Sequence, residues 1–269
     1  MSKLKNLVII PLCLGLITVS CKKDEDNPIS EPECIEHFSY DESAEDAPSK
    51  WENYCVADGG INECGSVVRQ SPINIVGGVE DLDLPFLTPI YNESYTDIVN
   101  NGHTIQFNYH GASSTLDFGG ETYSLLQFHF HASSEHTLGG SHHPLEVHLV
   151  HANASGGLAV IGAFFELGTE NEFLSEFTGS LPAHSGESYV DASLMYDATD
   201  LIPENNSYYN YNGSLTTPPC SEIVEWIVLE HPLEASQTQL DLFSGLLHGN
   251  YRPVQPLNGR TIKYRPSEG

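Results

Sequence analysis

The sequence predicts a mainly β protein, built as one domain with two or three short helices at its periphery. Short segments in which apolar residues alternate with polar ones, or run continuously, recur along the chain and are typical of strands. Pairs such as Gly77-Gly78, Asn101-Gly102 and Asn212-Gly213 punctuate them, as turns between strands do. No repeat, low-complexity block or linker interrupts residues 37–269, which favours one domain over that range.

Seven segments carry the strand pattern and two carry a helix pattern. The expected strands are SPINIV (71–76), TIQFNYH (104–110), STLDF (114–118), TYSLLQFHFH (122–131), EVHLVH (146–151), LAVIGAFFEL (158–167) and EIVEWIVL (222–229). Residues 171–181 and 236–247 have apolar residues at a spacing of three to four, and each segment starts with a capping residue, Asn171 or Ser236. We therefore expect helices there.

The composition permits a globular enzyme and disfavours nucleic-acid binding. Of the 269 residues, 39% are hydrophobic and 10% aromatic, which is enough for a sizeable core. Ten basic residues against 37 acidic ones give a formal charge of −27, and no block of the chain is rich in Lys or Arg. A phosphate backbone would be repelled by such a surface.

Residues 1–20 resemble an export signal. Lys3 and Lys5 provide a positive start, and Leu7–Val19 form an apolar centre that is short for a membrane span. Ser20 precedes Cys21, as in bacterial lipoprotein signals, where the cysteine becomes lipidated. Residues 21–36 are polar and predict a flexible linker.

We therefore expect a protein of the periplasm or cell surface, most simply an outer-membrane lipoprotein. Its membrane contact would then be through the lipid anchor alone. Thr18 stands where such signals usually have Leu, so cleavage without lipidation stays an alternative.

Four cysteines remain in the exported chain once Cys13, within the signal, and Cys21 are set aside. They are Cys34, Cys55, Cys64 and Cys220. An even number in an exported protein predicts disulfides, and the sequence alone allows three pairings. A CxxC metal motif is absent from the sequence.

Three histidines predict a catalytic zinc site. His129 and His131 are two residues apart in an expected strand, so both imidazoles point to one face of a sheet. His148 lies in the next strand segment, after Gly139 and Gly140, and we expect an antiparallel return to bring it beside them. Three histidines leave the fourth tetrahedral position of zinc open for water, which is typical of a catalytic site.

Two further side chains strengthen this interpretation. Gln127 and Glu146 each precede a proposed ligand by two residues and so lie on the same face. Such groups accept the spare ring N–H of a metal-bound histidine and fix its tautomer.

Six blocks of the chain resemble, in order, signature blocks of the α-class carbonic anhydrases. They are RQSPINI, NNGHTIQF, QFHFHASSEHT, PLEVHLVH, YNGSLTTPPCSE and RPVQPLNGR. The resemblance extends from about His37 to Arg265 and implies a central twisted sheet of about ten mostly antiparallel strands. It also implies reversible hydration of carbon dioxide to bicarbonate and a proton by zinc-bound hydroxide at the floor of a conical cleft, with a histidine proton shuttle.

The resemblance assigns roles around the metal. His129, His131 and His148 match the Zn²⁺ ligands, and Thr216 matches the residue that accepts a hydrogen bond from zinc-bound hydroxide. Glu135 matches the carboxylate that takes the threonine's proton. The expected partners of the ligand rings are Gln127, Glu146 and the backbone carbonyl of Asn250. His136, another candidate ligand by position, is expected to be structural.

The resemblance also assigns the walls of the cleft. His103 matches the proton shuttle, a task that suits histidine because its ordinary pKa is near neutrality. The residues expected to order the water network are Tyr40, Asn101, Gln106 and Thr217. The apolar wall expected to hold carbon dioxide, next to Thr217, consists of Val150, Val160, Leu215, Val224 and Trp226.

The chain keeps most family features and departs from some. Cys64 and Cys220 stand where secreted members form a disulfide, which leaves Cys34 and Cys55 as a second pair. Phe38-Ser39-Tyr40 replaces the common Trp-Gly-Tyr, a change that we expect to alter packing more than chemistry.

Two other functions fit the sequence less well than the enzyme. A catalytically silent, carbonic anhydrase-like surface binding protein is disfavoured, because silent relatives commonly lose a zinc histidine and this chain keeps all three. A zinc esterase of unrelated fold is disfavoured by the lack of an HExxH or GxSxG motif.

Overall fold

The structure describes residues 37–268, apart from the side chain of Asp58. The main element of this part of the chain is a twelve-stranded sheet. Its strands are β2 (Val79–Glu80), β3 (Ser94–Asn100), β4 (Ile105–Asn108), β5 (Thr115–Phe118), β6 (Glu121–His131), β8 (Leu145–Ala152), β9 (Leu158–Leu167), β10 (Ser188–Tyr196), β11 (Tyr208–Gly213), β12 (Val224–Leu229), β13 (Leu233–Ala235) and β14 (Lys263–Arg265). β1 (Asn74–Ile75) and β7 (Thr137–Leu138) form a separate pair.

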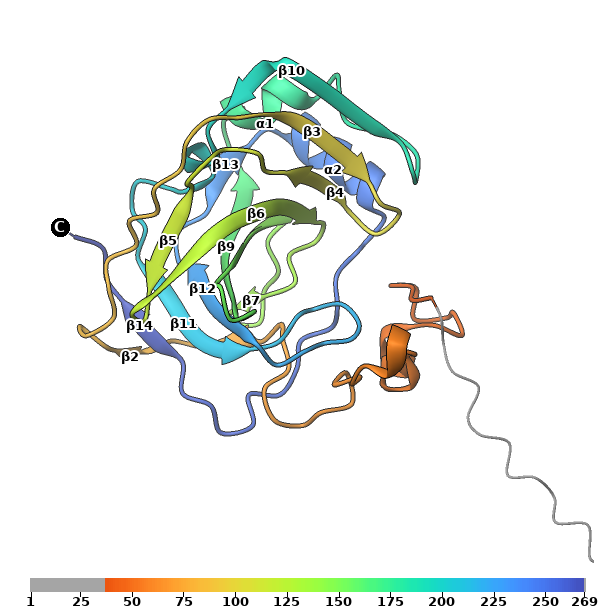
Figure 1. The fold of residues 1–269 in the computed structure, drawn as a ribbon, viewed down its shortest axis with the longest axis vertical. Helices are drawn as coiled ribbons and strands as arrows, with labels where there is room; N and C mark the ends of the chain where they lie inside the picture. The colour runs from red at the N-terminus through yellow and green to blue at the C-terminus, as the bar shows by residue number, and fades with distance from the viewer. Residues whose placement is uncertain (1–36, 269) are drawn as a thin grey trace, which may run out of the picture. The chain divides into compact units, whose positions relative to one another are not determined.

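Ten strands of this computed structural model follow one path through the sheet. Their order is β10-β3-β4-β6-β8-β9-β12-β11-β14-β2, while β5 pairs with β6 and β13 with β9 (Figure 1). Most neighbours are antiparallel, and the parallel pairs are β9 with β12, β9 with β13 and β14 with β2. The predicted fold class, a mostly antiparallel sheet with few short helices, is confirmed.

The strands that the sequence did not predict lie where polar residues are buried or where the sheet has an edge. β3 buries Ser94, Thr96 and Asn100 beside Ile98 on its inner face, so its inward positions are mostly polar and carry no apolar alternation. β10 is a mostly exposed edge strand. Asn212-Gly213, interpreted as a turn signal, ends β11; a Cβ on Gly213 would overlap the side chains of Ser71 and Trp226.

Two α-helices begin at the predicted caps. α1 (Glu172–Phe177) starts after Asn171, whose Oδ1 accepts the backbone N–H of Leu174 at 3.1 Å. α2 (Gln237–Leu247) starts with a capping box between Ser236 and Gln239. α1 ends four residues before the predicted Leu181, because Gly179 and then Pro182 disfavour further helical turns. Short 3₁₀ helices lie at η1 (Pro48–Asn53), η2 (Ala57–Gly59) and η3 (Ala198–Leu201).

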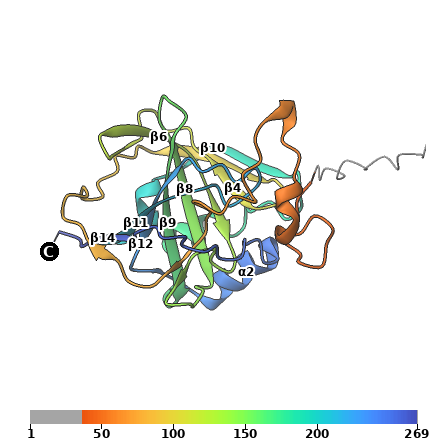
Figure 2. The same cartoon turned by 90° about the horizontal axis from the view of Figure 1, so that it is seen from below.

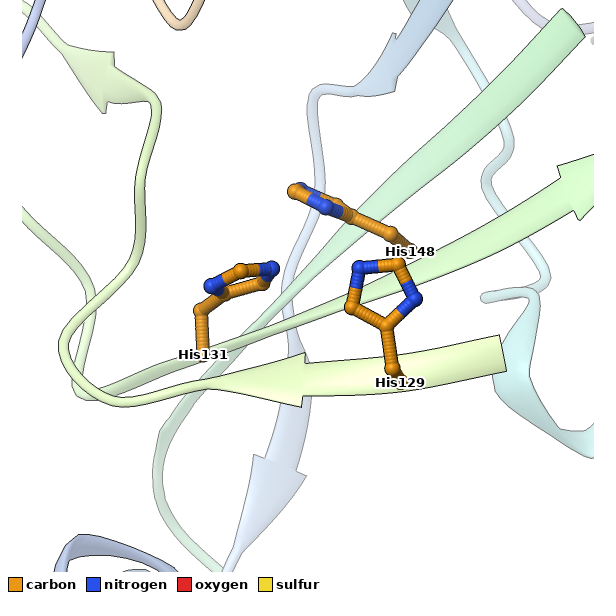
Figure 3. Close-up of side chains that lie close together, drawn as sticks. All are labelled: His129, His131 and His148. Carbon is orange, nitrogen blue, oxygen red and sulfur yellow. The ribbon is translucent and has the colours of Figure 1, made fainter. Parts of the chain in front are cut away.

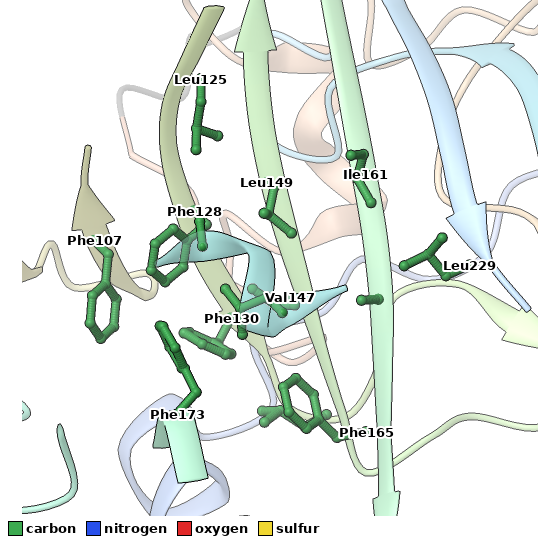
Figure 4. Packing of buried hydrophobic residues seen from close by; sticks show 14 of the residues in the cluster. Phe107, Leu125, Phe128, Phe130, Val147, Leu149, Ile161, Phe165, Phe173 and Leu229 are labelled. Atoms are coloured by element: carbon green, nitrogen blue, oxygen red, sulfur yellow. The ribbon is translucent and has the colours of Figure 1, made fainter. Parts of the chain in front are cut away.

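The central strands give one face to the core and the other to the site. On β6, Phe128 and Phe130 point into the core, while Gln127, His129 and His131 point the other way. Both α-helices contribute apolar side chains to this core, and Figure 4 shows Phe173 of α1 beside the sheet residues. Figure 2 shows α2 along one side of β8. The helices therefore cover the face opposite the histidines.

A small aromatic cluster joins the N-terminal lead-in to the sheet. Trp51 of η1 packs with the Cys64–Cys220 disulfide, and Phe38 and Tyr40 pack against them. The signal at 1–20, Cys21, the linker at 21–36 and the pairing partner proposed for Cys55, Cys34, lie outside the described residues. No helix within residues 37–268 is long and apolar enough to cross a membrane.

The disulfide is expected to stabilise the fold substantially. It links cysteines 156 residues apart, and a cross-link over so long a loop contributes about 5 kcal/mol in the chain-entropy account. The variant Cys64→Ala/Cys220→Ala should therefore melt roughly 10–20 °C below the wild type by circular dichroism. A difference of less than about 2 °C would show that the bridge does not constrain the unfolded chain.

His151 is a buried histidine remote from the cleft chemistry. It is fully buried, its Nδ1 donates to the Ala159 carbonyl at 3.1 Å, and its Nε2 accepts from the Tyr91 hydroxyl at 2.8 Å. Burial lowers the pKa of His151 to about 4, although hydrogen bonds to backbone carbonyls oppose the shift. The ring is therefore neutral in the folded protein at pH 7.

This burial predicts a loss of stability in acid. The unfolded chain takes up a proton on His151 below its ordinary pKa of about 6.5, and the folded chain does so only near 4, so stability falls as pH drops through that window. The loss amounts to about 3 kcal/mol. Urea unfolding of the metal-free protein at pH 7 and 4.5 should show a smaller difference for His151→Gln than for the wild type. Equal differences would contradict the assignment.

Candidate metal centre and cleft

The imidazoles of His129, His131 and His148 point toward one another (Figure 3). They lie on the face of the sheet opposite the core that the α-helices join. His129 and His131 lie on β6, and His148 on β8 is the direct register partner of His129. One ring nitrogen from each lies within 4.8 Å of the others. The alternation of strand residues and the antiparallel return expected from the sequence thus bring these three side chains together.

Each ring donates one N–H to an oxygen and keeps a lone pair on its other nitrogen. The acceptors are Gln127 Oε1 for His129 Nδ1 (2.9 Å), the Asn250 carbonyl for His131 Nδ1 (2.6 Å) and Glu146 Oε1 for His148 Nε2 (2.8 Å). The free lone pairs are then on Nε2 of the first two histidines and on Nδ1 of the third. These nitrogens are the ones available to a metal.

The donor set fits zinc. His131 Nε2 is buried with no hydrogen-bond partner in the described part of the chain, which is costly unless a ligand completes it. Burial holds the pKa of His129 well below, and that of His131 below, the ordinary value, so both rings offer lone pairs at neutral pH. At His148 burial lowers the pKa, but the charge of Glu146, the hydrogen bond to it and the charge of Glu135 together outweigh burial and raise the pKa, which makes this ring the more basic donor.

A cavity of about 290 Å³ leads to these histidines. All five residues expected at its polar side line it, together with the rings of two ligand candidates. Those five are Tyr40, Asn101, His103, Gln106 and Thr217. The sequence interpretation did not include Phe38 and Thr104, which also line the cavity.

His103 lies at the side of this cavity in the turn between β3 and β4. Its backbone N–H donates to Asn101 Oδ1 at 2.9 Å, and its carbonyl accepts from Asn250 Nδ2 at 2.9 Å. Its ring stacks on Phe38, with centroids 3.9 Å apart and an interplanar angle of 14°. Burial lowers the pKa of His103, partly opposed by the charge of Asp46.

The apolar residues form a row across three neighbouring strands. Val150 on β8 pairs with Val160 on β9, and Val160 pairs with Trp226 on β12. Val224 belongs to the same buried cluster, against which Leu215 packs. Because Val150 is also the register partner of Gln127, the row continues the ligand face of β6.

Comparison with known proteins identifies the family. A model of the eukaryotic-type carbonic anhydrases matches residues 46–266. The chain belongs to the α-carbonic anhydrase family. A carbonic anhydrase of Klebsiella pneumoniae is 41% identical over 232 residues, covering 84% of this chain and 90% of that protein. The chain is thus an enzyme of a zinc-dependent family that hydrates carbon dioxide.

Solved structures support the same family. The α-carbonic anhydrase from Thermovibrio ammonificans, in complex with the inhibitor sulfanilamide, is 38% identical with a TM-score of 0.78, covering 85% of this chain and 99% of that one. Dioscorin complexed with ascorbate is 28% identical with a TM-score of 0.77, covering 87% and 99%.

Glu146 connects several parts of this α-carbonic anhydrase site. Its Oε1 accepts from both His148 and His136 at 2.8 Å, and its Oε2 accepts the backbone N–H groups of Glu135 (2.7 Å) and His136 (2.9 Å). Burial raises the pKa of Glu146, but the nearby His136 and His148 outweigh it and hold the pKa well below the ordinary value. Gly162 leaves room for this carboxylate, because a Cβ there would lie 3.0 Å from Oε1.

The hydrogen bonds that continue this network beyond His136 were not predicted from the sequence. His136 Nε2 forms a hydrogen bond with the Tyr211 hydroxyl at 2.6 Å, and that hydroxyl forms a second one with Ser71 Oγ at 2.9 Å. Together with the hydrogen bond from His136 Nδ1 to Glu146, the contact with Tyr211 occupies both ring nitrogens of His136, which agrees with the structural role expected for it. Tyr211 and Ser71 lie within the YNGSLTTPPCSE and RQSPINI blocks, so the blocks were a signal but the pairing was not visible.

Glu135 presents one occupied and one free oxygen. Its Oε1 accepts the Arg252 backbone N–H at 2.8 Å. Its Oε2 has no hydrogen-bond partner in the described part of the chain and lies 3.6 Å from His131 Nε2. Thr216, the residue expected to donate to it, is also buried. Arg252, whose guanidinium binds Gln70 Oε1, is a further contributor that the sequence reasoning missed.

Removing the hydrogen bond that orients His129 should weaken metal binding. We expect Gln127→Ala to lower zinc affinity by roughly 10- to 100-fold, measured by competition with a chromogenic chelator. Gln106→Ala is the matched control, because Gln106 is the register partner of His129 but its amide donates to Asn108 instead. Equal affinities of the two variants would contradict the orienting role of Gln127.

Proposed function

We propose that this chain binds one Zn²⁺ through His129, His131 and His148 and hydrates carbon dioxide reversibly to bicarbonate and a proton. The observation that carries the proposal is the convergence of three imidazole nitrogens with free lone pairs beside an apolar wall. Zinc, when bound, supplies Lewis acidity that brings the pKa of water to about 7, a value established for carbonic anhydrases as a class.

Thr216 and Glu135 would orient the attacking oxygen. The free Oε2 of Glu135 is an acceptor, and Thr216 would donate its hydroxyl proton to it. The Thr216 oxygen can then only accept a hydrogen bond, so it binds an attacking oxygen that carries a hydrogen. This hydrogen bond turns the lone pair of the attacking oxygen toward the apolar wall. The backbone N–H of Arg252 occupies the other oxygen, Oε1, and so fixes the direction in which Oε2 points.

The apolar wall would hold the substrate and release the product. Carbon dioxide carries no net charge and needs few hydrogen bonds, so the side chains of Val150, Val160 and Trp226 suit it. Bicarbonate is an anion, and a wall of this kind cannot compensate its loss of hydration. The wall therefore favours exchange of the product for water.

The proton would leave through His103. This residue lines the same cavity as His129 and His131, and its ring is half-buried. Imidazole suits proton transfer because its ordinary pKa is near neutrality, although burial lowers the pKa of His103. Tyr40, Asn101, Gln106 and Thr217 supply hydroxyl and amide groups along the intervening space. They can order the waters through which the proton moves.

A silent binding protein is the alternative that the fold permits. The structure of dioscorin with ascorbate has the same fold, and a fold by itself does not assign chemistry. The intact ligand set, with the free Glu135 oxygen beside it, favours the enzyme.

Zinc content and catalysis should be lost together when a ligand is removed. The purified protein is expected to contain one zinc per chain and to hydrate carbon dioxide in stopped-flow assays, whereas His131→Ala should have neither property. His136→Gln is the comparison, because His136 uses its ring nitrogens within the hydrogen-bond network and should not be needed as a ligand. A fully metallated but inactive wild type would favour the binding protein instead.

The pH dependence of turnover tests the shuttle. Burial lowers the pKa of His103, so the basic form persists to lower pH and the midpoint of kcat in weak buffer should lie below about 6.5. His103→Ala should lower kcat by roughly 10- to 100-fold, remove this midpoint and recover partly when imidazole is added. Its kcat/KM should change little. A variant with wild-type kcat in weak buffer would refute the shuttle.

A further inference from the structure

A second cavity, here named the side cavity, adjoins the cleft. Its volume is about 680 Å³, and it shares four lining residues with the cleft: Phe38, Tyr40, His103 and Thr104. The rest of its lining comes from the lead-in on both sides of Tyr40, from the end of β3 and the turn that follows it, and from the end of α2 with the loop after it. The side cavity therefore lies against the proposed shuttle but does not include the metal ligands.

His103 is the one shared residue that can pass a proton between the two cavities near neutral pH. Phe38 does not ionise, Thr104 keeps its hydroxyl proton, and burial raises the pKa of Tyr40 well above its ordinary value. The Phe38 ring covers one face of the His103 imidazole, so a proton carrier must approach the ring edge, where the nitrogens lie. The stack and the two backbone hydrogen bonds of His103 limit its movement.

The lining of the side cavity has an acidic bias. Asp41 and Glu42 contribute exposed carboxylates, and His248 and Tyr251 are its other ionisable residues apart from the shared ones. No lysine or arginine belongs to its lining within residues 37–268. Such a cavity favours a cationic guest over an anionic one.

We propose that the side cavity is the docking site of the soluble base that takes the proton from His103, and that it selects neutral nitrogen bases over anionic oxyacid buffers. This inference rests on the proposed shuttle role of His103. In the transfer, the N–H bond of the imidazolium breaks and its electron pair stays on the ring, while a new N–H bond forms on the carrier. The carrier leaves as a cation, which the carboxylates of Asp41 and Glu42 stabilise; dehydration runs the same steps in reverse.

Buffer-dependent turnover tests the proposal, with imidazole and phosphate as the probes. The second-order rate constant for proton transfer is obtained from ¹⁸O exchange or stopped-flow turnover at increasing buffer concentration and low ionic strength. We expect the ratio of the imidazole to the phosphate constant to fall by about three- to tenfold in Asp41→Asn/Glu42→Gln. Glu45→Gln is the matched control, because Glu45 is an exposed neighbour outside the cavity lining.

A second variant tests whether the carrier needs the volume of the side cavity, independently of the cavity's charge. Leu246→Trp should fill part of the side cavity, because Leu246 lines it and does not line the cleft, and should lower the imidazole constant while kcat/KM for carbon dioxide stays unchanged. An unchanged ratio in the charge variant, or an unchanged imidazole constant in folded Leu246→Trp, would overturn the proposal.

The variant His103→Ala distinguishes a failure of the proposed shuttle from a failure of the proposed docking site. If this variant keeps wild-type turnover in weak buffer, the shuttle itself is wrong and the side cavity loses its role. If it loses turnover while the side-cavity variants behave as wild type, the docking site alone is wrong. If imidazole rescues His103→Ala equally well with and without Leu246→Trp, the carrier reaches the cleft directly when the shuttle is missing, which supports His103 as the link to the side cavity.

Discussion

The buried carboxylate of Glu146 is the charge around which the floor of the site is organised. An ionised group removed from water costs several kcal/mol unless donors surround it. Glu146 receives two imidazole N–H groups and two backbone N–H groups. Because the backbone donors belong to Glu135 and His136, the same carboxylate fixes the orientation of His148 and the segment that carries Glu135. The geometry of the proposed ligands and the carboxylate proposed to orient Thr216 are thus set by one buried anion.

The core fixes the register on which this arrangement depends. Phe128 and Phe130 alternate with the proposed ligands His129 and His131 on β6, and Val147 and Leu149 flank His148 on β8. A slip of one residue between these strands would turn the imidazoles toward the core and the aromatic rings toward the cleft. Burial of the apolar face therefore enforces the pairing of His129 with His148, although neither histidine belongs to the core.

The sequence predicts those parts of the site that local periodicity controls. The spacing of His129 and His131 places them on one face, and Gln127 follows from the same rule. Pairings between distant segments have no such local signal. The Asn250 carbonyl reaches His131 across 119 residues, and only the family resemblance pointed to it. Arg252 and Tyr211 stayed hidden because a buried polar residue resembles an exposed one in sequence. The stack of Phe38 on His103 depends on an irregular segment with no periodicity.

Asn250 shows why the proposed metal centre and the proposed shuttle are not independent parts. Its carbonyl accepts from His131, its Oδ1 accepts the backbone N–H of Ala132, and its Nδ2 donates to the carbonyls of His103 and Phe130. One residue therefore joins the end of β6 to the turn that carries His103. A proton relay through water depends steeply on the distance between its two ends. A rigid link between the ends holds this distance constant, which contacts that fix each end alone do not do. The carbonyl oxygen and the side-chain amide of this asparagine together supply that link.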